Sequence, residues 1–238
     1  MIHPCLRLVA GLVIGVSLAS CGLISSDVTN FDLTLPDKKF TIDTGRWQVN
    51  QAAADLYLAQ TCTMTSMCAV PSQACMTGCS GSCGQAQPRT CELSLDVSVS
   101  QKVDLVAEKP ELKSINDEPV IKVAIDSVTY EVTNNTLSVD TPELTLYVAP
   151  ISVVKVDPND PMIKAIGTIA PVPAMQVTAS PQPIMFTAAG KAELVNIMSA
   201  FKTPFNVLIG STIVVKSGQK VPSGKLDAVV HIKGHAGL

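Results

Sequence analysis

Six of the chain's eight cysteines fall within 30 residues, and this cluster constrains the fold more than any other feature of the sequence. The six are Cys62, Cys68, Cys75, Cys79, Cys83 and Cys91, and they are interleaved with Gly, Ser, Thr and Pro. The segment has too little apolar bulk to be held by packing alone. An even number of cysteines in an exported chain predicts three disulfides, and the sequence does not choose among the possible pairings.

A metal site is the alternative interpretation of the same segment. Met64, Met67 and Met76 lie among the cysteines, and thiolate with thioether ligands suits Cu(I). Against this, the segment has no histidine and lacks the C-x2-C spacing of zinc ribbons. Cys75 and Cys79, and Cys79 and Cys83, have C-x3-C spacing, whereas a redox-active pair of cysteines normally has C-x-x-C spacing. The sequence therefore favours structural disulfides, with no metal and no cofactor.

The N-terminus predicts export. Arg7 precedes an uncharged apolar run, Leu8 to Leu18, which is too short to span a bilayer and is typical of a signal-peptide core. The run ends in Leu18-Ala19-Ser20-Cys21, which would become the site of cleavage. A soluble secreted protein, cut at Ala19 or Ser20, is the plain alternative.

Leu18-Ala19-Ser20-Cys21 resembles the lipobox of bacterial lipoproteins. The resemblance implies that residues 1–20 are removed and that Cys21 is lipidated. Gly22 stands where an aspartate would imply retention in the inner membrane, so the resemblance implies the outer membrane. Residues 21–28 would be a tether of about 25 Å reach. Residues 29–238 would form a single domain with a Cys-rich insertion at 62–91.

Composition narrows the possible partners. The net charge is −3 and is unclustered, which argues against nucleic acid. Charged residues make up 16% of the chain, against about 25% in typical soluble domains. Aromatic residues make up only 4%, which disfavours the stacking platforms used to bind sugars or single-stranded nucleic acid.

Alternating apolar residues predict that most of the chain is sheet. Strands are expected at 31–35, 40–42, 93–99, 121–125, 128–132, 144–148, 151–156, 175–178, 205–216 and 226–233. A change of phase at Asp126-Ser127 indicates a bulge or bend, and Asn134-Asn135 indicates a tight hairpin. Residues 47–60 weakly favour helix. A late helix follows Thr187, a good N-cap, and runs to about Lys202 with Leu194, Val195, Ile197, Met198 and Phe201 on one face.

Together these elements predict an antiparallel β-sandwich with one late helix and a disulfide-stapled Cys-rich loop. Residues 91–238 faintly resemble type-2 late-embryogenesis-abundant domains, also called water-stress-hypersensitive domains. The resemblance rests on VTYEV at 128–132, AIGTIAPVPA at 165–174, the late helix and the two closing strands, and the family's Asn-Pro-Asn signature is absent. It implies a small non-enzymatic sandwich linked to stress tolerance.

The sequence contains no recognisable catalytic motif. His231 and His235 are the only histidines after residue 20, and both are expected on the surface rather than on a metal. Asp96, Asp104, Asp126 and Asp140 are expected to face solvent. Asp157-Pro158-Asn159-Asp160-Pro161 could offer calcium ligands but is better explained as a turn. We therefore expect no catalytic residues and no enzymatic activity.

Two function classes remain. The first is a membrane-anchored envelope lipoprotein that acts as a structural or protein-interaction module. The second is a periplasmic carrier of an apolar ligand such as lipid, suggested by low charge and by the apolar, Pro-rich segment 163–186. A large dry cavity between the sheets, or co-purified lipid, would favour the carrier.

Overall fold

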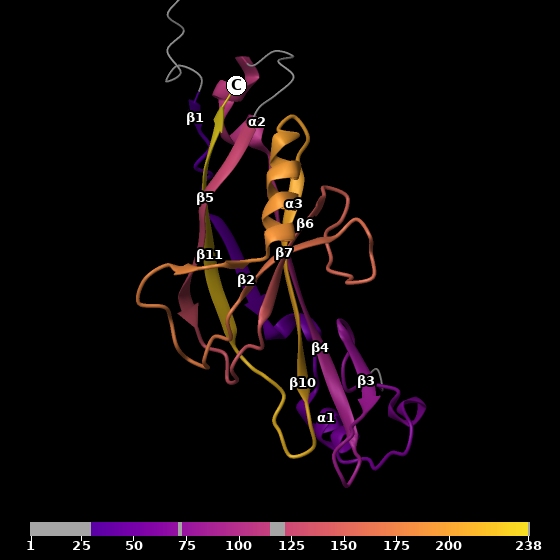
Figure 1. The fold of residues 1–238 in the computed structure, drawn as a ribbon. Coiled ribbons are helices and arrows are strands. Elements are labelled where there is room, and N and C mark those ends of the chain that lie inside the picture. The colour runs from indigo at the N-terminus through magenta and orange to yellow at the C-terminus, as the bar shows by residue number, and fades with distance from the viewer. Residues whose placement is uncertain (1–29, 71–72, 115–121, 238) are drawn as a thin grey trace, which may run out of the picture.

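The computed structural model describes residues 30–70, 73–114 and 122–237. Over these residues the chain forms two antiparallel sheets that face each other, as predicted (Figure 1). The first sheet consists of β1 (Asn30–Asp32), β2 (Lys38–Asp43), β5 (Lys122–Asn135), β8 (Gln182–Pro183) and β11 (Lys225–Gly237). The second sheet consists of β3 (Cys79–Cys83), β4 (Cys91–Val103), β6 (Leu144–Pro150), β7 (Lys164–Ile169), β9 (Met185–Phe186) and β10 (Phe205–Val215).

Two long strands organise the sheets. In the first sheet β11 lies in the centre, paired with β1 and β2 along one edge and with β5 along the other. In the second sheet β10 pairs with both β4 and β6. The helices described are α1 (Gln51–Leu58), α2 (Leu105–Glu108) and α3 (Ala188–Ser199), with short 3-10 turns η2 (Thr44–Trp47), η3 (Thr65–Cys68) and η4 (Pro110–Ser114).

The alternation read from the sequence places apolar side chains between the sheets. Along β4 every second residue from Cys91 to Val99 is buried, and the intervening residues are half-buried. The first sheet contributes buried side chains from β11, namely Leu226, Val230 and Ile232. Apolar burial of this kind is the main force that holds two sheets together.

Polar contacts close one side of the sandwich, where β2 lies beside β4. Gln101 Nε2 donates to the carbonyl oxygen of Lys39 at 2.6 Å. The buried Lys38 ammonium contacts Glu108 Oε1, also at 2.6 Å, beyond the end of β4. The last part of β4, beyond its pairing with β3, and β2 therefore cover each other.

The late helix and the bulge are confirmed. Thr187 Oγ1 accepts from the N–H of Gly190 at 2.9 Å and caps α3, which buries Leu194 and Met198. Gly190 lies so close to the main chain of Ile166 that any Cβ would overlap it, and α3 can therefore pack tightly on β7. Asp126 is the extra residue of the bulge, because Ile125 pairs with Gly234 and Ser127 with Lys233.

The prediction of a tight hairpin at Asn134-Asn135 is wrong. Both residues lie in β5 and pair with Asp227 and Leu226, and the chain then crosses to β6 in the other sheet. The Asn135 amide donates to the carbonyl oxygens of Pro173 and Gln176, both at 2.9 Å. Its Oδ1 accepts from the N–H of Leu137 at 3.0 Å, so the side chain makes a local turn contact where the chain leaves β5 as well as the two distant ones.

The predictions of two short strands, at 151–156 and 175–178, are also wrong. Residues 151–156 form a loop over the outer face of the second sheet, held by Asn206 Nδ2 to the Val153 carbonyl oxygen and by the Val156 N–H to Ser98 Oγ, both at 2.8 Å. Ala174 and Met175 form a turn, in which Met175 has φ of 58°, and residues 176–178 follow without regular structure. In the first segment hydrogen bonds to side chains, and in the second a turn, take the place of the backbone hydrogen bonds that a paired strand would make.

Candidate functional site

The Cys-rich segment forms a distinct part of the molecule, which we call the disulfide lobe. It comprises residues 51–70 and 73–95 and contains α1, η3, β3 and the first part of β4. Its first helix begins at Asn50, whose side chain accepts from the N–H of Ala53 at 3.1 Å, so the weakly predicted helix is confirmed over Gln51–Leu58. Figure 1 shows the lobe at the end of the molecule opposite β1.

Three disulfides hold the lobe, as predicted. They join Cys62 to Cys83, Cys68 to Cys91 and Cys75 to Cys79. The first two span 21 and 23 residues and cross each other in sequence order, whereas the third spans four. The crossed pair ties the segment before β3 to both strands of the β3–β4 hairpin.

Tyr57 is the main packing residue between these bonds, and its side chain is fully buried. Its hydroxyl donates to the carbonyl oxygen of Cys68 at 2.8 Å and lies 3.3 Å from that of Glu92. Burial raises the pKa of the Tyr57 hydroxyl, so it stays protonated as a donor. A side chain at Gly81 would overlap both Tyr57 and the Cys68 carbonyl, so only glycine fits beneath them.

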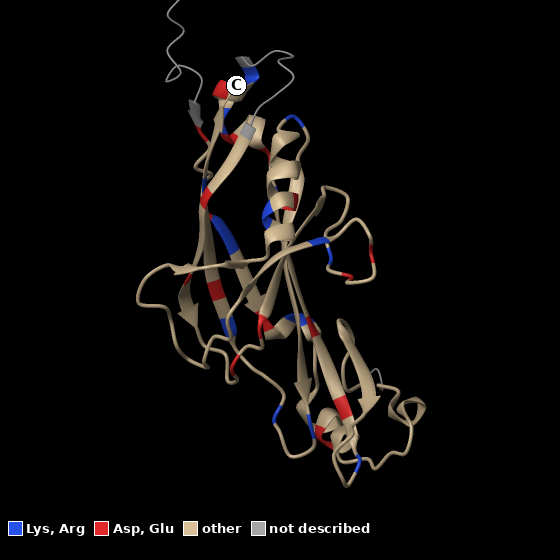
Figure 2. Cartoon of the chain, viewed as in Figure 1, with Lys and Arg blue, Asp and Glu red and all other residues tan. Residues whose placement is uncertain are grey.

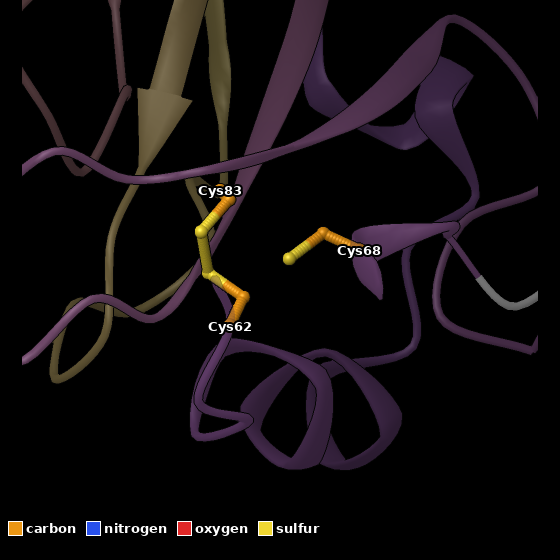
Figure 3. A group of neighbouring side chains, drawn as sticks. All are labelled: Cys62, Cys68 and Cys83. Atoms are coloured by element: carbon orange, nitrogen blue, oxygen red, sulfur yellow. A yellow bond between two sulfur atoms is a disulfide. The ribbon is translucent and has the colours of Figure 1, made fainter. Parts of the chain in front are cut away.

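The sulfur atoms of the crossed disulfides form one cluster. The Sγ atoms of Cys62, Cys68 and Cys83 lie within 4.8 Å of one another, and all three residues are buried. Figure 3 shows the Cys68 sulfur directed at the Cys62–Cys83 bond. Among the described residues this is the one group with metal-ligand spacing, but every sulfur in it is already bonded to another sulfur. The disulfides thus account for the ligands that a copper site would need.

The lobe exposes apolar side chains and carries few charges. Leu56, Met64, Met67 and Met76 are each more than half exposed. No Lys, Arg, Asp or Glu occurs between Asp55 and Arg89, and Figure 2 shows this stretch in tan. Because exposed apolar side chains can take part in interactions with other proteins, and few charges accompany them here, the surface of the lobe is the candidate functional site. The methionines, first considered as metal ligands, are its main constituents.

Both histidines pair with carboxylates on the outer face of the first sheet. His231 Nδ1 contacts Asp37 Oδ1 at 2.7 Å, and His235 Nδ1 contacts Asp126 Oδ1 at 2.9 Å. His231 points away from the buried Val230 and Ile232, as expected. The two rings bind different aspartates, so the structure does not bring them together at one site.

The other carboxylates singled out from the sequence have local roles. Asp104 caps α2 and pairs with Lys102, and Asp140 accepts from the N–H of Ala174 at 2.7 Å. Asp96 is half-buried, and its carbonyl oxygen accepts from Trp47 Nε1. In the Asp157–Pro161 turn, Asp157 Oδ1 accepts from the N–H of Asn159 at 2.9 Å, which agrees with the turn interpretation.

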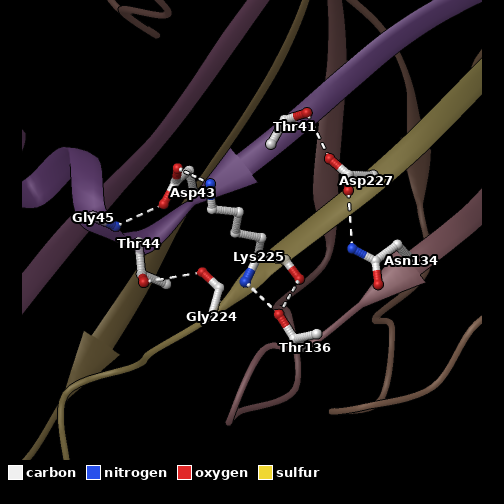
Figure 4. A network of polar contacts seen from close by, with 9 residues as sticks. All are labelled: Thr41, Asp43, Thr44, Gly45, Asn134, Thr136, Gly224, Lys225 and Asp227. Carbon is white, nitrogen blue, oxygen red and sulfur yellow. Dashed lines mark hydrogen bonds and ion pairs between the residues drawn. The ribbon is translucent and has the colours of Figure 1, made fainter.

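A network of polar contacts joins β2, β11 and β5 at the edge of the first sheet (Figure 4). Asp227 accepts from Asn134 Nδ2 at 3.0 Å and from Thr41 Oγ1 at 2.7 Å, and these bonds lower the pKa of its carboxyl. The hydrogen bond from Lys225, followed by that from the N–H of Gly45, lowers the pKa of Asp43. Each carboxylate is occupied by donors from a neighbouring strand, so the network joins the strands.

Apolar side chains from both sheets pack around a small cavity. A cavity of about 10 Å³ remains among Phe40, Tyr130, Ile209 and their neighbours, which is room for about one water molecule. The larger hollows are open clefts on the surface. One, of about 480 Å³, lies beside the 151–160 loop and contains Asp96, Lys155 and Asp157. The cavity among Phe40, Tyr130 and Ile209 is too small for a lipid chain.

Cys21 and the lipobox lie outside the described residues, as does the whole tether. Among the residues described, no helix is long and apolar enough to cross a membrane. The chain matches no known protein family, no curated protein and no solved structure. The lipoprotein and late-embryogenesis-abundant resemblances therefore stay predictions.

Proposed function

We propose that the protein is an outer-membrane lipoprotein of the cell envelope, anchored by lipid on Cys21 and acting as a non-enzymatic protein-interaction module. The apolar run followed by Leu18-Ala19-Ser20-Cys21 supports the anchor. Three disulfides support export, because they form and persist in oxidising compartments. Lipid anchoring through several acyl chains is durable in a way that a single chain is not.

The observation that carries the proposal is the position of the disulfide lobe relative to residue 30. The nine residues from Cys21 to Thr29 reach at most about 30 Å, so the end of the body that carries β1 stays near the membrane. The lobe lies at the other end, as Figure 1 shows. Anchored in this way, the molecule directs the lobe away from the membrane.

The surface of the lobe suits an apolar partner. Its long uncharged stretch offers no charge for a strongly charged ligand, and its exposed methionines can adapt to differently shaped surfaces. We therefore propose that the lobe binds an uncharged, apolar surface of another envelope protein. The alternative function, a carrier of an apolar ligand, gains no support from the cavity of about 10 Å³ between the sheets, which is too small for a lipid chain.

The anchor is tested by metabolic labelling with a palmitate analogue. Wild-type protein should take up the label and fractionate with membranes, and Cys21→Ala should lose both properties. Cys5→Ala is the matched control, because Cys5 lies in the segment that is removed and its substitution should leave the labelling unchanged. Label that survives Cys21→Ala would contradict the anchor.

The binding surface is tested by placing a photo-crosslinking amino acid at single positions. Met64 and Met67 probe the lobe, and Met162 and Met185 are matched exposed methionines on the sandwich. We expect one reproducible protein adduct from the lobe positions and none from the control positions. Adducts confined to Met162 or Met185 would move the interaction surface to the sandwich. Lipid recovered with the purified protein would instead favour the carrier.

A further inference from the structure

The crossed disulfides are not the bonds that the unfolded chain forms most easily. Cys62 and Cys68 are six residues apart, and Cys83 and Cys91 are eight apart, whereas the native bonds span 21 and 23 residues. Each doubling of loop length costs about 0.6 kcal/mol in closure entropy, so the short loops close more readily. Of the ways to pair all six cysteines, the sequential one, Cys62–Cys68, Cys75–Cys79 and Cys83–Cys91, closes the shortest loops, and it is thus favoured before the lobe folds.

The folded lobe keeps both neighbouring pairs close to bonding distance. The Sγ atoms of Cys62 and Cys68 lie within 4.8 Å of each other. Cys83 and Cys91 are direct partners in the β3–β4 ladder. The adjacent pair, Gly84 and Thr90, is hydrogen-bonded, so Cys83 and Cys91 form a non-hydrogen-bonded pair, in which Cα atoms are typically about 4.5 Å apart. That separation is within the range of disulfides.

We propose that the lobe matures by a disulfide exchange that converts Cys62–Cys68 and Cys83–Cys91 into Cys62–Cys83 and Cys68–Cys91, and that its partner in this step is a thiol–disulfide isomerase. The same four sulfur atoms make up both sets of bonds. Cys75–Cys79 is a neighbouring pair in either set and takes no part. The exchange needs no oxidant, because two disulfides are present before and after it.

The exchange proceeds through three thiolate attacks. The isomerase thiolate attacks Cys68, forms a mixed disulfide and releases the Cys62 thiolate. Cys62 then attacks Cys83, forming the native Cys62–Cys83 bond and releasing the Cys91 thiolate. Finally Cys91 attacks Cys68 in the mixed disulfide, which forms Cys68–Cys91 and returns the isomerase as a thiolate.

Burial explains why a protein partner is needed. Cys62, Cys68, Cys83 and Cys91 are each at most 5% exposed, so the packed lobe offers no sulfur to a thiol from solution. Attack must occur while the lobe is open and its uncharged, apolar segment is accessible. A thiol–disulfide isomerase that binds open, apolar segments can reach these sulfur atoms, and its thiol of lowered pKa can attack them.

The test is refolding of the reduced full-length protein in a glutathione redox buffer, with quenching by alkylation at intervals. The Cys75→Ser/Cys79→Ser variant simplifies the assignment. Cleavage after methionine and after Lys or Arg then gives residues 47–64, 68–76, 77–89 and 90–102, each with a single cysteine. Native bonds join 47–64 to 77–89 and 68–76 to 90–102, whereas neighbouring bonds join 47–64 to 68–76 and 77–89 to 90–102. Fragmentation of the linked wild-type peptides gives the same assignment if the variant fails to fold.

We expect the neighbouring bonds to appear first and a catalytic amount of a thiol–disulfide isomerase to speed their conversion about tenfold or more. Cys68→Ser/Cys91→Ser in the Cys75→Ser/Cys79→Ser background is the matched control, because Cys62 and Cys83 are then the only cysteines of the lobe, and their bond forms directly and should be unaffected by the isomerase. Native bonds that form first, or a wild-type rate that the isomerase does not change, would overturn the proposal. Refolding does not depend on Cys21, so its failure would leave the proposed anchor and binding surface standing.

Discussion

The sandwich and the disulfide lobe solve the same stability problem by different means. In the sandwich, two sheets bury regularly alternating apolar side chains such as Leu146 and Val230 against each other. In the lobe, the buried centre combines Leu58, Leu93 and Leu95 with the disulfide sulfur atoms and with Tyr57, whose hydroxyl donates to the Cys68 carbonyl oxygen. The lobe therefore adds covalent bonds to packing between residues 61 and 91, where apolar bulk is scarce.

The largest effect should come from the core of the sandwich. Phe205 begins β10, pairs with Val103 and Pro150, and is 1% exposed. Phe205→Ala should lower the free energy of unfolding in urea by about 3–5 kcal/mol, because it removes buried area and leaves a cavity. Val214→Ala, at an exposed position of the same strand, should cost less than about 0.5 kcal/mol. Similar losses for the two variants would contradict the packing account.

The next largest loss of stability is expected from removing one of the crossed disulfides. Cys68→Ser/Cys91→Ser opens a span of 23 residues and should destabilise the lobe by about 3 kcal/mol on the chain-entropy account. Cys75→Ser/Cys79→Ser opens a span of four and should cost less, about 2 kcal/mol. Limited proteolysis should show cuts in residues 51–95 before cuts in the strands of the sandwich. Cleavage of both regions at the same rate would mean that the lobe is no separate unit of stability.

A smaller effect is expected at Tyr57. Tyr57→Phe keeps the ring but removes the donor to the Cys68 carbonyl, at a cost of about 1–2 kcal/mol. Hydrogen exchange should quicken in the lobe and stay unchanged in β10 and β11. An equal change in both regions would show that the lobe and the sandwich unfold together.

The smallest effect is the pH dependence of the strand-joining network. Hydrogen bonds from Asn134 and Thr41 lower the pKa of Asp227, so its stabilising contribution is complete above the unfolded-state pKa near 4 and is lost as pH falls through the lower folded-state value. The contribution of such an exposed group is below about 1 kcal/mol. Urea unfolding of wild type and Asp227→Asn, at pH 7 and pH 3, should show the difference in stability between them shrinking at pH 3. A constant difference would remove Asp227 as a source of acid sensitivity.

The features that could be predicted from the sequence are those in which local pattern and tertiary structure agree. Alternation predicted β4 and β11, the phase change predicted the bulge at Asp126, and Thr187 predicted the start of α3. The predicted hairpin at Asn134-Asn135 does not form, because both residues continue β5 and pair with Asp227 and Leu226 of β11, and acceptors some 40 residues away bind the Asn135 amide. No local signal in the sequence encodes those acceptors.

The candidate site shows the same division. The cysteine count predicted three disulfides, but their pairing depends on distances that only the fold sets. The exposed surface formed by Leu56 and the methionines was missed, although the long run without charge was a visible signal of it. Methionine there suggested metal ligands, whereas exposure indicates a contact surface.

The most direct test of the covalent account is hydrogen exchange on two preparations of the protein. One is native, and the other is unfolded, reduced and refolded in reductant. We predict that reduction removes protection from residues 51–92 while β5, β6, β10 and β11 keep theirs, because packing alone holds the sandwich. Protection that persists in the reduced lobe, or that disappears from the sandwich as well, would contradict the division between covalent and packed regions.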